Sequence, residues 1–127
     1  MTACWRSLRW ACLAALLTLA VTGPAHAITT LTSPSLSMEA DGGVNCRIVN
    51  LGPKPIQVAI EIVGAAGQVI DSNNITVQPG AVGSEEIALG VNFVAYCRFS
   101  GNFNQNSVRA SIDATTENRT IAIAPAN

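Results

Sequence analysis

Along most of the chain after residue 27, apolar residues occupy every second position, and this period of two limits the fold more than any other feature. Residues 56–62 show it in full: isoleucine or valine fills four alternate positions, with Gln57, Ala59 and Glu61 between them. Successive side chains of a β-strand point to opposite faces, so such a segment predicts a strand with one buried face. No segment of this part keeps helical spacing over three turns. The chain is therefore predicted to be all-β.

Turn signals separate the alternating segments at short intervals. Two prolines and a glycine lie within residues 50–55, two glycines within 64–67, and a Pro-Gly pair at 79–80. Seven or eight short strands, with turns about every 8–12 residues, are typical of an antiparallel β-sandwich. The expected strands are residues 44–48, 56–62, 69–70, 75–77, a segment within 84–89, 93–99, 108–112 and 120–124, with 28–37 as a loosely held first strand.

The first 27 residues have the pattern of a secretory signal peptide. Basic Arg6 and Arg9 precede an apolar run over residues 10–21, which a Gly-Pro pair and an Ala-His-Ala exit follow. The run is shorter than the roughly 20 residues that a membrane-spanning helix needs. We therefore expect a cleaved signal peptide, residues 1–27, and a single β-sandwich domain, residues 28–127. Such a protein is exported to the periplasm or the extracellular space and has no membrane span.

Two of the four cysteines remain after the predicted cleavage. Cys4 and Cys12 fall within the signal peptide, whereas Cys46 and Cys97 lie on the apolar faces of two expected strands. Outside the reducing cytosol, two such cysteines are expected to pair. Because both point inward from strands far apart in sequence, the disulfide is predicted to join the two sheets.

The segment of residues 44–52, Val-Asn-Cys-Arg-Ile-Val-Asn-Leu-Gly, and the alternating strand after it resemble bacterial immunoglobulin-like modules. Together with Ala-Tyr-Cys-Arg-Phe at residues 95–99, the chain also looks like small exported bacterial proteins that carry one cysteine in each of these strands. The resemblance implies an immunoglobulin-like antiparallel β-sandwich and supplies no active-site residue. Two features depart from antibody-type domains: the third strand has no tryptophan, and Tyr96 adjoins Cys97, whereas the tyrosine-corner residue would occupy Ala95.

Residues suited to catalysis are scarce after position 27. The one histidine, His26, belongs to the signal peptide, so no imidazole is left to activate a nucleophile or to bind a transition metal. Glu85 and Glu86 are neighbours on a strand and point to opposite faces, which prevents them from acting as an acid–base pair. Glu39 and Asp41 share a face; a polar turn is the favoured interpretation, and a weak calcium site is the alternative. We expect no enzyme and no cofactor.

Charge and loop composition favour a binding role. Residues 28–127 hold five basic and eight acidic residues, a net charge of −3, which disfavours nucleic acid as a partner. The candidate partner-binding loop, residues 101–107, is rich in amides and contains one apolar residue, which either anchors a partner or folds back onto the sandwich. In an immunoglobulin-like topology the turn of residues 50–55 lies at the same end. The candidate residues are Lys54, Asn102, Phe103, Asn104, Gln105 and Asn106.

Two functions remain open from the sequence. The first is a non-catalytic exported protein that binds a protein or cell-envelope partner through loops or strand edges. The alternative is a structural subunit that self-assembles by edge-strand pairing. Low charge favours assembly, since Lys54 is the only lysine and charged residues normally protect strand edges.

Overall fold

The computed structural model describes residues 27–116 and 119–126, with side chains up to residue 116 and again from 125. The predicted signal peptide lies outside the described residues, apart from Ala27. Within the described part every long element is a strand and no α-helix occurs, which confirms the all-β prediction. The strands are β1 (Thr29–Thr32), β2 (Leu36–Met38), β3 (Gly42–Asn50), β4 (Ile56–Gly64), β5 (Val69–Val77), β6 (Val82–Ala88), β7 (Phe93–Gly101), β8 (Val108–Thr116) and β9 (Arg119–Pro125), and a 3-10 helix, η1 (Gln105–Ser107), precedes β8.

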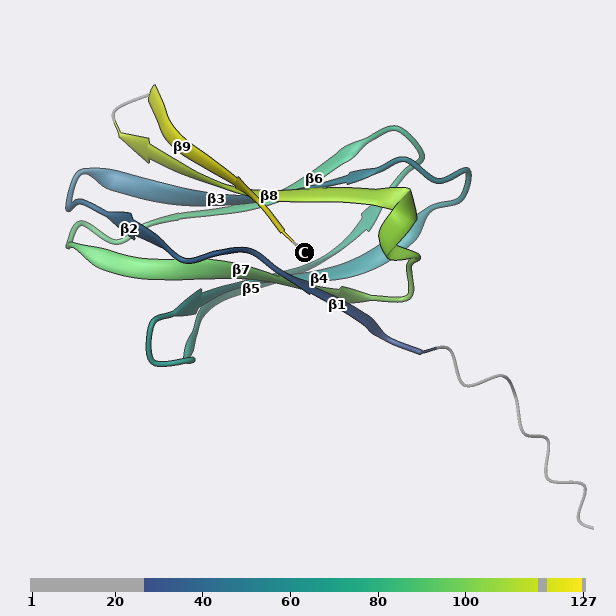
Figure 1. The fold of residues 1–127 in the computed structure, drawn as a ribbon, viewed down its shortest axis with the longest axis horizontal. Coiled ribbons are helices and arrows are strands. Elements are labelled where there is room, and N and C mark those ends of the chain that lie inside the picture. Colours follow the sequence, from purple (N-terminus) through teal and green to yellow (C-terminus); the bar gives the residue numbers. More distant parts are fainter. Residues whose placement is uncertain (1–26, 117–118, 127) are drawn as a thin grey trace, which may run out of the picture.

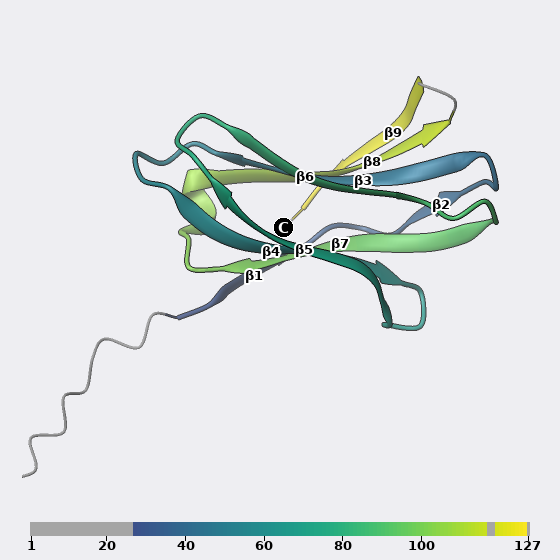
Figure 2. The same cartoon turned by 180° about the vertical axis from the view of Figure 1, so that it is seen from behind.

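The strands form two antiparallel sheets that face each other (Figure 1). Sheet A has the order β1-β7-β4-β5, with β2 also paired to β7, and sheet B has the order β6-β3-β8-β9. Strands β5 and β6 form the edges on one side of the molecule (Figure 2). The connection from β7 to β8 does not form a hairpin, because β8 pairs with β3 in the other sheet.

The core lies between the sheets and is formed by the alternate positions that the sequence pattern selects. Val44, Cys46 and Ile48 of β3 are fully buried, and so are Cys97 and Phe99 of β7. Burial of such aliphatic and aromatic side chains is the main favourable term in folding. The remaining large, fully buried side chains of the core are Val58, Ile60, Ile62, Val77, Val108 and Ile112.

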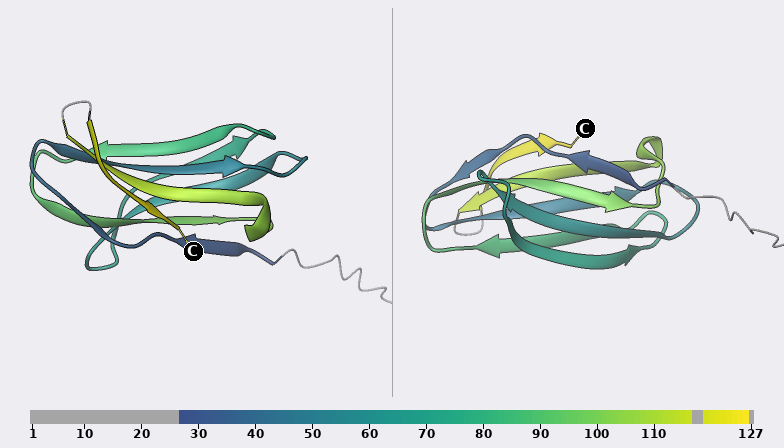
Figure 3. Two further views of the ribbon diagram at one scale, coloured as in Figure 1. Left: turned by 45° about the horizontal axis from the view of Figure 1, so that its top comes forward. Right: turned by 90° about the horizontal axis from the view of Figure 1, so that it is seen from below.

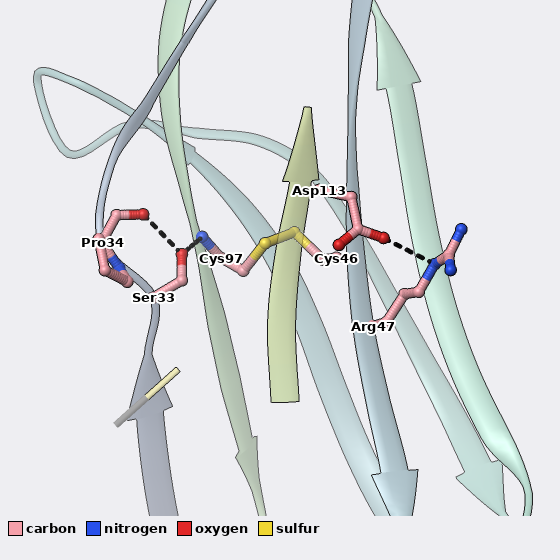
Figure 4. Close-up of a disulfide and its surroundings, with 6 residues drawn as sticks. All are labelled: Ser33, Pro34, Cys46, Arg47, Cys97 and Asp113. Atoms are coloured by element: carbon pink, nitrogen blue, oxygen red, sulfur yellow. Dashed lines mark hydrogen bonds and ion pairs between the residues drawn. A yellow bond between two sulfur atoms is a disulfide. The ribbon is translucent and has the colours of Figure 1, made fainter. Parts of the chain in front are cut away.

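A disulfide joins Cys46 of β3 to Cys97 of β7, as the sequence predicts (Figure 4). Their Cα atoms are 5.7 Å apart, and 51 positions separate them in the sequence. Since β3 belongs to sheet B and β7 to sheet A, the bond links the two sheets through the middle of the core.

The beginning of the domain pairs with β7 in two places. Residues 29–38 form two strands on β7, separated at Pro34, which has no N–H for a ladder hydrogen bond. Ser33 secures the break: its N–H donates to the carbonyl of Cys97 at 2.9 Å, and its hydroxyl accepts from the N–H of Cys97 at 2.9 Å. The first strand expected within residues 28–37 is therefore present, but as two short strands on β7. Strand β5 also differs, because it runs unbroken where two short segments were expected.

Candidate functional site

Three chain connections meet at one end of the sandwich (Figure 3). We call this the loop end; it consists of residues 50–55, 78–81 and 101–107. Backbone hydrogen bonds tie its parts together: the N–H of Leu51 donates to Ser107 at 2.8 Å, and that of Asn50 donates to Ala81 at 3.1 Å. The turn of residues 50–55 and the amide-rich loop thus lie together, as the sequence analysis expected.

The side chain of Asn50 organises the loop end. It is fully buried. Its Nδ2 donates to the carbonyl of Lys54 at 2.8 Å and to that of Val77 at 3.0 Å, while its Oδ1 accepts from the N–H of Gly52 at 2.9 Å. Its main-chain carbonyl accepts from Gly80 at 2.7 Å. One amide therefore fixes the turn of residues 50–55 and connects it to the end of β5, which holds the neighbouring loops in a set geometry.

Phe103 does not project as an anchor; its side chain is only 6% exposed and belongs to the core. The second of the two alternatives for this residue is therefore the correct one. The reason is the path of the loop: it crosses from sheet A to sheet B over the end of the core, and its one apolar side chain closes that end. Gly101 permits this packing, since a Cβ there would lie 3.0 Å from the ring of Phe103.

The other candidate side chains remain at the surface. Asn102, Gln105, Asn106 and Lys54 are exposed at the loop end. Asn104 is exposed as well, but it caps η1: its Oδ1 accepts from the N–H of Asn106 at 2.9 Å. Five of the six residues selected from the sequence are therefore exposed in the connections that form the loop end.

Leu51 is an exposed apolar residue of the loop end that the sequence analysis does not select. Its side chain is 56% exposed, in the turn between β3 and β4. Scattered exposed apolar residues are normal on soluble proteins, so exposure alone assigns no role. Its position is informative, because its N–H donates to the carbonyl of Ser107, the last residue of η1, and this bond fixes the turn against the loop of residues 101–107. An apolar residue between Asn and Gly in a polar turn is the signal that could have identified it.

The four outer strands differ in how their free edges are protected. Strand β5 is nine residues long and contains one charge, Asp71, with no lysine or proline. Strand β6 contains Glu85 at a position that pairs with inward-facing Cys46, and an inward charge of this kind discourages pairing with another chain. The β1 and β2 edge is short and broken, and β9 contains an arginine and a proline. Strand β5 is thus the least protected edge.

Sheet A carries an open recess and an ion pair. An open recess of about 450 Å³ lies on the outer face of sheet A, lined by small, polar and aliphatic residues without a titratable side chain. Arg98 forms a half-exposed ion pair with Glu61, whose hydrogen bond and charge raise the pKa of the guanidinium. No group of three or more His, Cys, Asp or Glu side chains in residues 27–116 is placed to hold a metal ion.

The structure places the acidic residues selected from the sequence in two regions, on β6 and in the turn before β3. Glu85 is paired with Cys46 on the inner face of sheet B, and Glu86 with Asn45 on its outer face, so the two carboxylates diverge. Glu39 is in an exposed turn before β3, where its carbonyl accepts from the N–H of Gly42 at 2.9 Å. In the part of the chain that the structure covers, no helix is long and apolar enough to cross a membrane.

Comparisons with known proteins identify the fold class only. No protein-family model matches the chain, and no curated protein matches it. Among solved structures, the chain is similar to the crystal structure of Thermotoga maritima 1070, with a TM-score of 0.57. The match covers 77% of this chain and 91% of the other, at 8% sequence identity. At that identity the likeness concerns the arrangement of the strands and carries no function.

Proposed function

We propose that this chain is a non-catalytic exported protein of immunoglobulin-like architecture that binds a protein or cell-envelope partner through the loop end. The disulfide supports export, since such bonds persist in oxidising compartments. A cleaved signal peptide at residues 1–27 and a periplasmic or extracellular location belong to this proposal, as does kinship with the small exported bacterial proteins named above.

The strand pairing supports an immunoglobulin-like sandwich in which two outer strands have exchanged sheets. In immunoglobulin domains the two cysteine strands lie in opposite sheets, one beside the first strand and the other beside the last. Here the strands β3 and β7 hold the cysteines, but β1 pairs with β7 and β8 pairs with β3. The outer strands β1 and β8 have therefore exchanged sheets relative to an immunoglobulin domain. The four strands β3, β4, β6 and β7 keep the immunoglobulin arrangement.

One observation carries the binding role: the buried amide of Asn50 fixes the turn of residues 50–55, which exposes the side chains of Leu51 and Lys54. A fixed surface loses little conformational entropy on association. An exposed apolar side chain surrounded by polar ones is the composition of a small interface centre with a polar rim. The recess of about 450 Å³ on sheet A is lined by residues without a titratable side chain, so it does not compete with this interpretation.

Site-specific photocrosslinking in producing cells tests this role. A photoreactive amino acid at Leu51 is expected to yield one dominant covalent adduct. The same amino acid at Val69, which is 46% exposed in the hairpin at the far end of β4, is the matched control. Lys54→Glu is expected to weaken the adduct formed at Leu51. Equal adducts at both positions, or none at Leu51, would refute the loop end as the binding surface.

The edge of β5 favours a second function, self-assembly. An edge strand with few charges and no proline offers its free N–H and C=O groups to a second copy. Light scattering of the oxidised protein over a range of concentrations should then show growth in mass. Asn73→Lys in β5 should abolish the growth, whereas Asn106→Lys should not. A monomer at every concentration would rule out this function.

A further inference from the structure

Three oxygen-bearing side chains lie in one row across the outer face of sheet B. Asn45 of β3 pairs with Glu86 of β6 on one side and with Asp113 of β8 on the other. Directly opposed residues of neighbouring antiparallel strands share a face, with Cβ atoms about 5 Å apart. The row therefore places one amide between two carboxylates.

The amide of Asn45 is only half satisfied in this arrangement. The residue is 8% exposed, and its Nδ2 donates to the Oε2 of Glu86 at a long 3.3 Å. Its Oδ1 is buried and has no hydrogen-bond donor. Buried polar atoms nearly always have a partner, so this oxygen requires an explanation. Turning the amide over gives no relief, because its oxygen would then face the carboxylate of Glu86 in place of the NH₂ group.

The charge of the row is also incompletely balanced. Asp113 is 3% exposed, and its Oδ2 lies 3.1 Å from the Nε of Arg47 (Figure 4). The side chain of Arg47 is 49% exposed, so it can turn into solvent. With Arg47 in place, two carboxylates share one cation.

Oxygen atoms border the row at the end away from Arg47. The next position of β3 on the same face is Gly43, which pairs with Ala88 of β6. A Cβ at Gly43 would lie 3.0 Å from the carbonyl oxygen of Ile87 and 3.3 Å from the hydroxyl of Thr115. That hydroxyl donates to the carbonyl of Gly43 at 3.3 Å. The surroundings of Asn45 at this end are therefore polar.

We propose that Glu86, Asn45 and Asp113 form a weak calcium site on the outer face of sheet B. The Oδ1 of Asn45 and one oxygen from each carboxylate would bind the ion, and water would complete its shell. Calcium accepts six to eight oxygen ligands in irregular geometry, whereas magnesium demands a near-ideal octahedron, so this uneven set favours calcium. Asn45 thereby gains the positive partner that its buried oxygen lacks.

The expected affinity is low. Only two carboxylates contribute charge, and Arg47 competes for one of them. A dissociation constant of about 10⁻⁴–10⁻³ M is typical of calcium sites in extracellular modules. The physiological value of such a site rests on the proposed export, because free calcium is far lower inside cells. Calcium binding itself is independent of the partner at the loop end, so the two proposals fail separately.

Titration of the oxidised protein with calcium, followed by calorimetry and by thermal unfolding, tests the site. Saturable binding is expected, and the melting temperature should rise by about 5–10 °C at ten times the dissociation constant. Magnesium at the same concentration should give a much smaller rise. No calcium-dependent heat or shift up to about 20 mM, well above the expected dissociation constant, would overturn the proposal.

Three variants separate a calcium site from general ion effects. Glu86→Gln should weaken calcium binding at least tenfold, while Glu85→Gln, its neighbour on the inner face, should leave it unchanged. Arg47→Gln should strengthen calcium binding several-fold, because it frees Asp113. If Arg47 served only as a structural ion pair, its removal would lower the melting temperature without improving calcium affinity. Equal behaviour of Glu86→Gln and Glu85→Gln would also overturn the assignment.

Discussion

Replacing Asn50 by Asp should destabilise the protein more than replacing it by Ala, although Asp has almost the same shape. Asn50→Ala removes three hydrogen bonds: the one to Val77 is buried, and those to Lys54 and Gly52 are partly buried. The buried carbonyl of Val77 is left without a donor, and the two partly buried hydrogen bonds are lost as well. Together these losses cost about 3 kcal/mol. Asn50→Asp keeps the bond from Gly52 but directs an oxygen at two carbonyl groups and buries a charge, which costs about 4–5 kcal/mol at pH 7.

The difference between the two variants should depend on pH. Burial and two facing carbonyl oxygens raise the pKa of the new carboxyl group in the folded state above its unfolded value. The folded Asn50→Asp variant therefore holds a proton at a pH where the unfolded chain has lost it. Its stability relative to the wild type should recover as the pH falls toward 4, whereas Asn50→Ala should show no such recovery.

Urea unfolding at pH 7 and near pH 4 measures both effects. Asn106→Asp is the matched control, since Asn106 is exposed at the same end of the sandwich and should change stability by less than about 0.5 kcal/mol. If Asn50→Asp is no less stable than Asn50→Ala at pH 7, the side chain does not act as a buried donor and the account of the loop end is wrong.

Three further predictions concern the core and the loop that crosses it. Phe103→Ala should lower the free energy of unfolding, measured in urea, by about 3–4 kcal/mol, as expected for a buried ring. Leu51→Ala should lower it by less than about 0.5 kcal/mol. Similar losses for the two variants would contradict the assignment of Phe103 to the core and of Leu51 to the surface. Replacing Cys46 and Cys97 by Ala should lower stability by about 4 kcal/mol in the loop-entropy model, and thermal unfolding with and without reductant checks this against the wild type. Gly101→Ala should cost more than about 2 kcal/mol, because its Cβ would meet a main-chain carbonyl of β4; an unchanged denaturation midpoint would show that the loop can shift aside.

Strand content could be predicted from the sequence because local alternation reports burial directly. Val44, Cys46 and Ile48 are buried as their spacing requires, and the disulfide follows from two inward positions, since no other cysteine occurs after residue 27. Strand pairing could not be predicted this way. The loop after β7 is long enough either to turn back as a hairpin or to cross to β3, and its own residues do not decide between the two. The choice depends on which pairing of β8 buries the core better, and that depends on the whole chain.

The loop end could be predicted in part for a similar reason. Composition identifies its exposed amides and Lys54, and the expected topology predicts that the loop of residues 101–107 lies close to the turn of residues 50–55. Phe103 was ambiguous, because an apolar residue in a polar loop has the same sequence signature whether it is buried or exposed. Asn50 was missed as the organising residue, although an asparagine two positions before a glycine in a proline-rich turn is a typical Asx-turn signal.

The pairing of the first strand has a consequence for how the chain folds. Thr30 in β1 lies beside Ser100 in β7, 70 positions later in the sequence. The first strand therefore has no partner until β7 has been synthesised, and β8 must return to β3 before sheet B has its central pair. Contacts of such high sequence separation slow folding, because a long loop must close before they form. Neither sheet can therefore be completed before the last third of the domain is available.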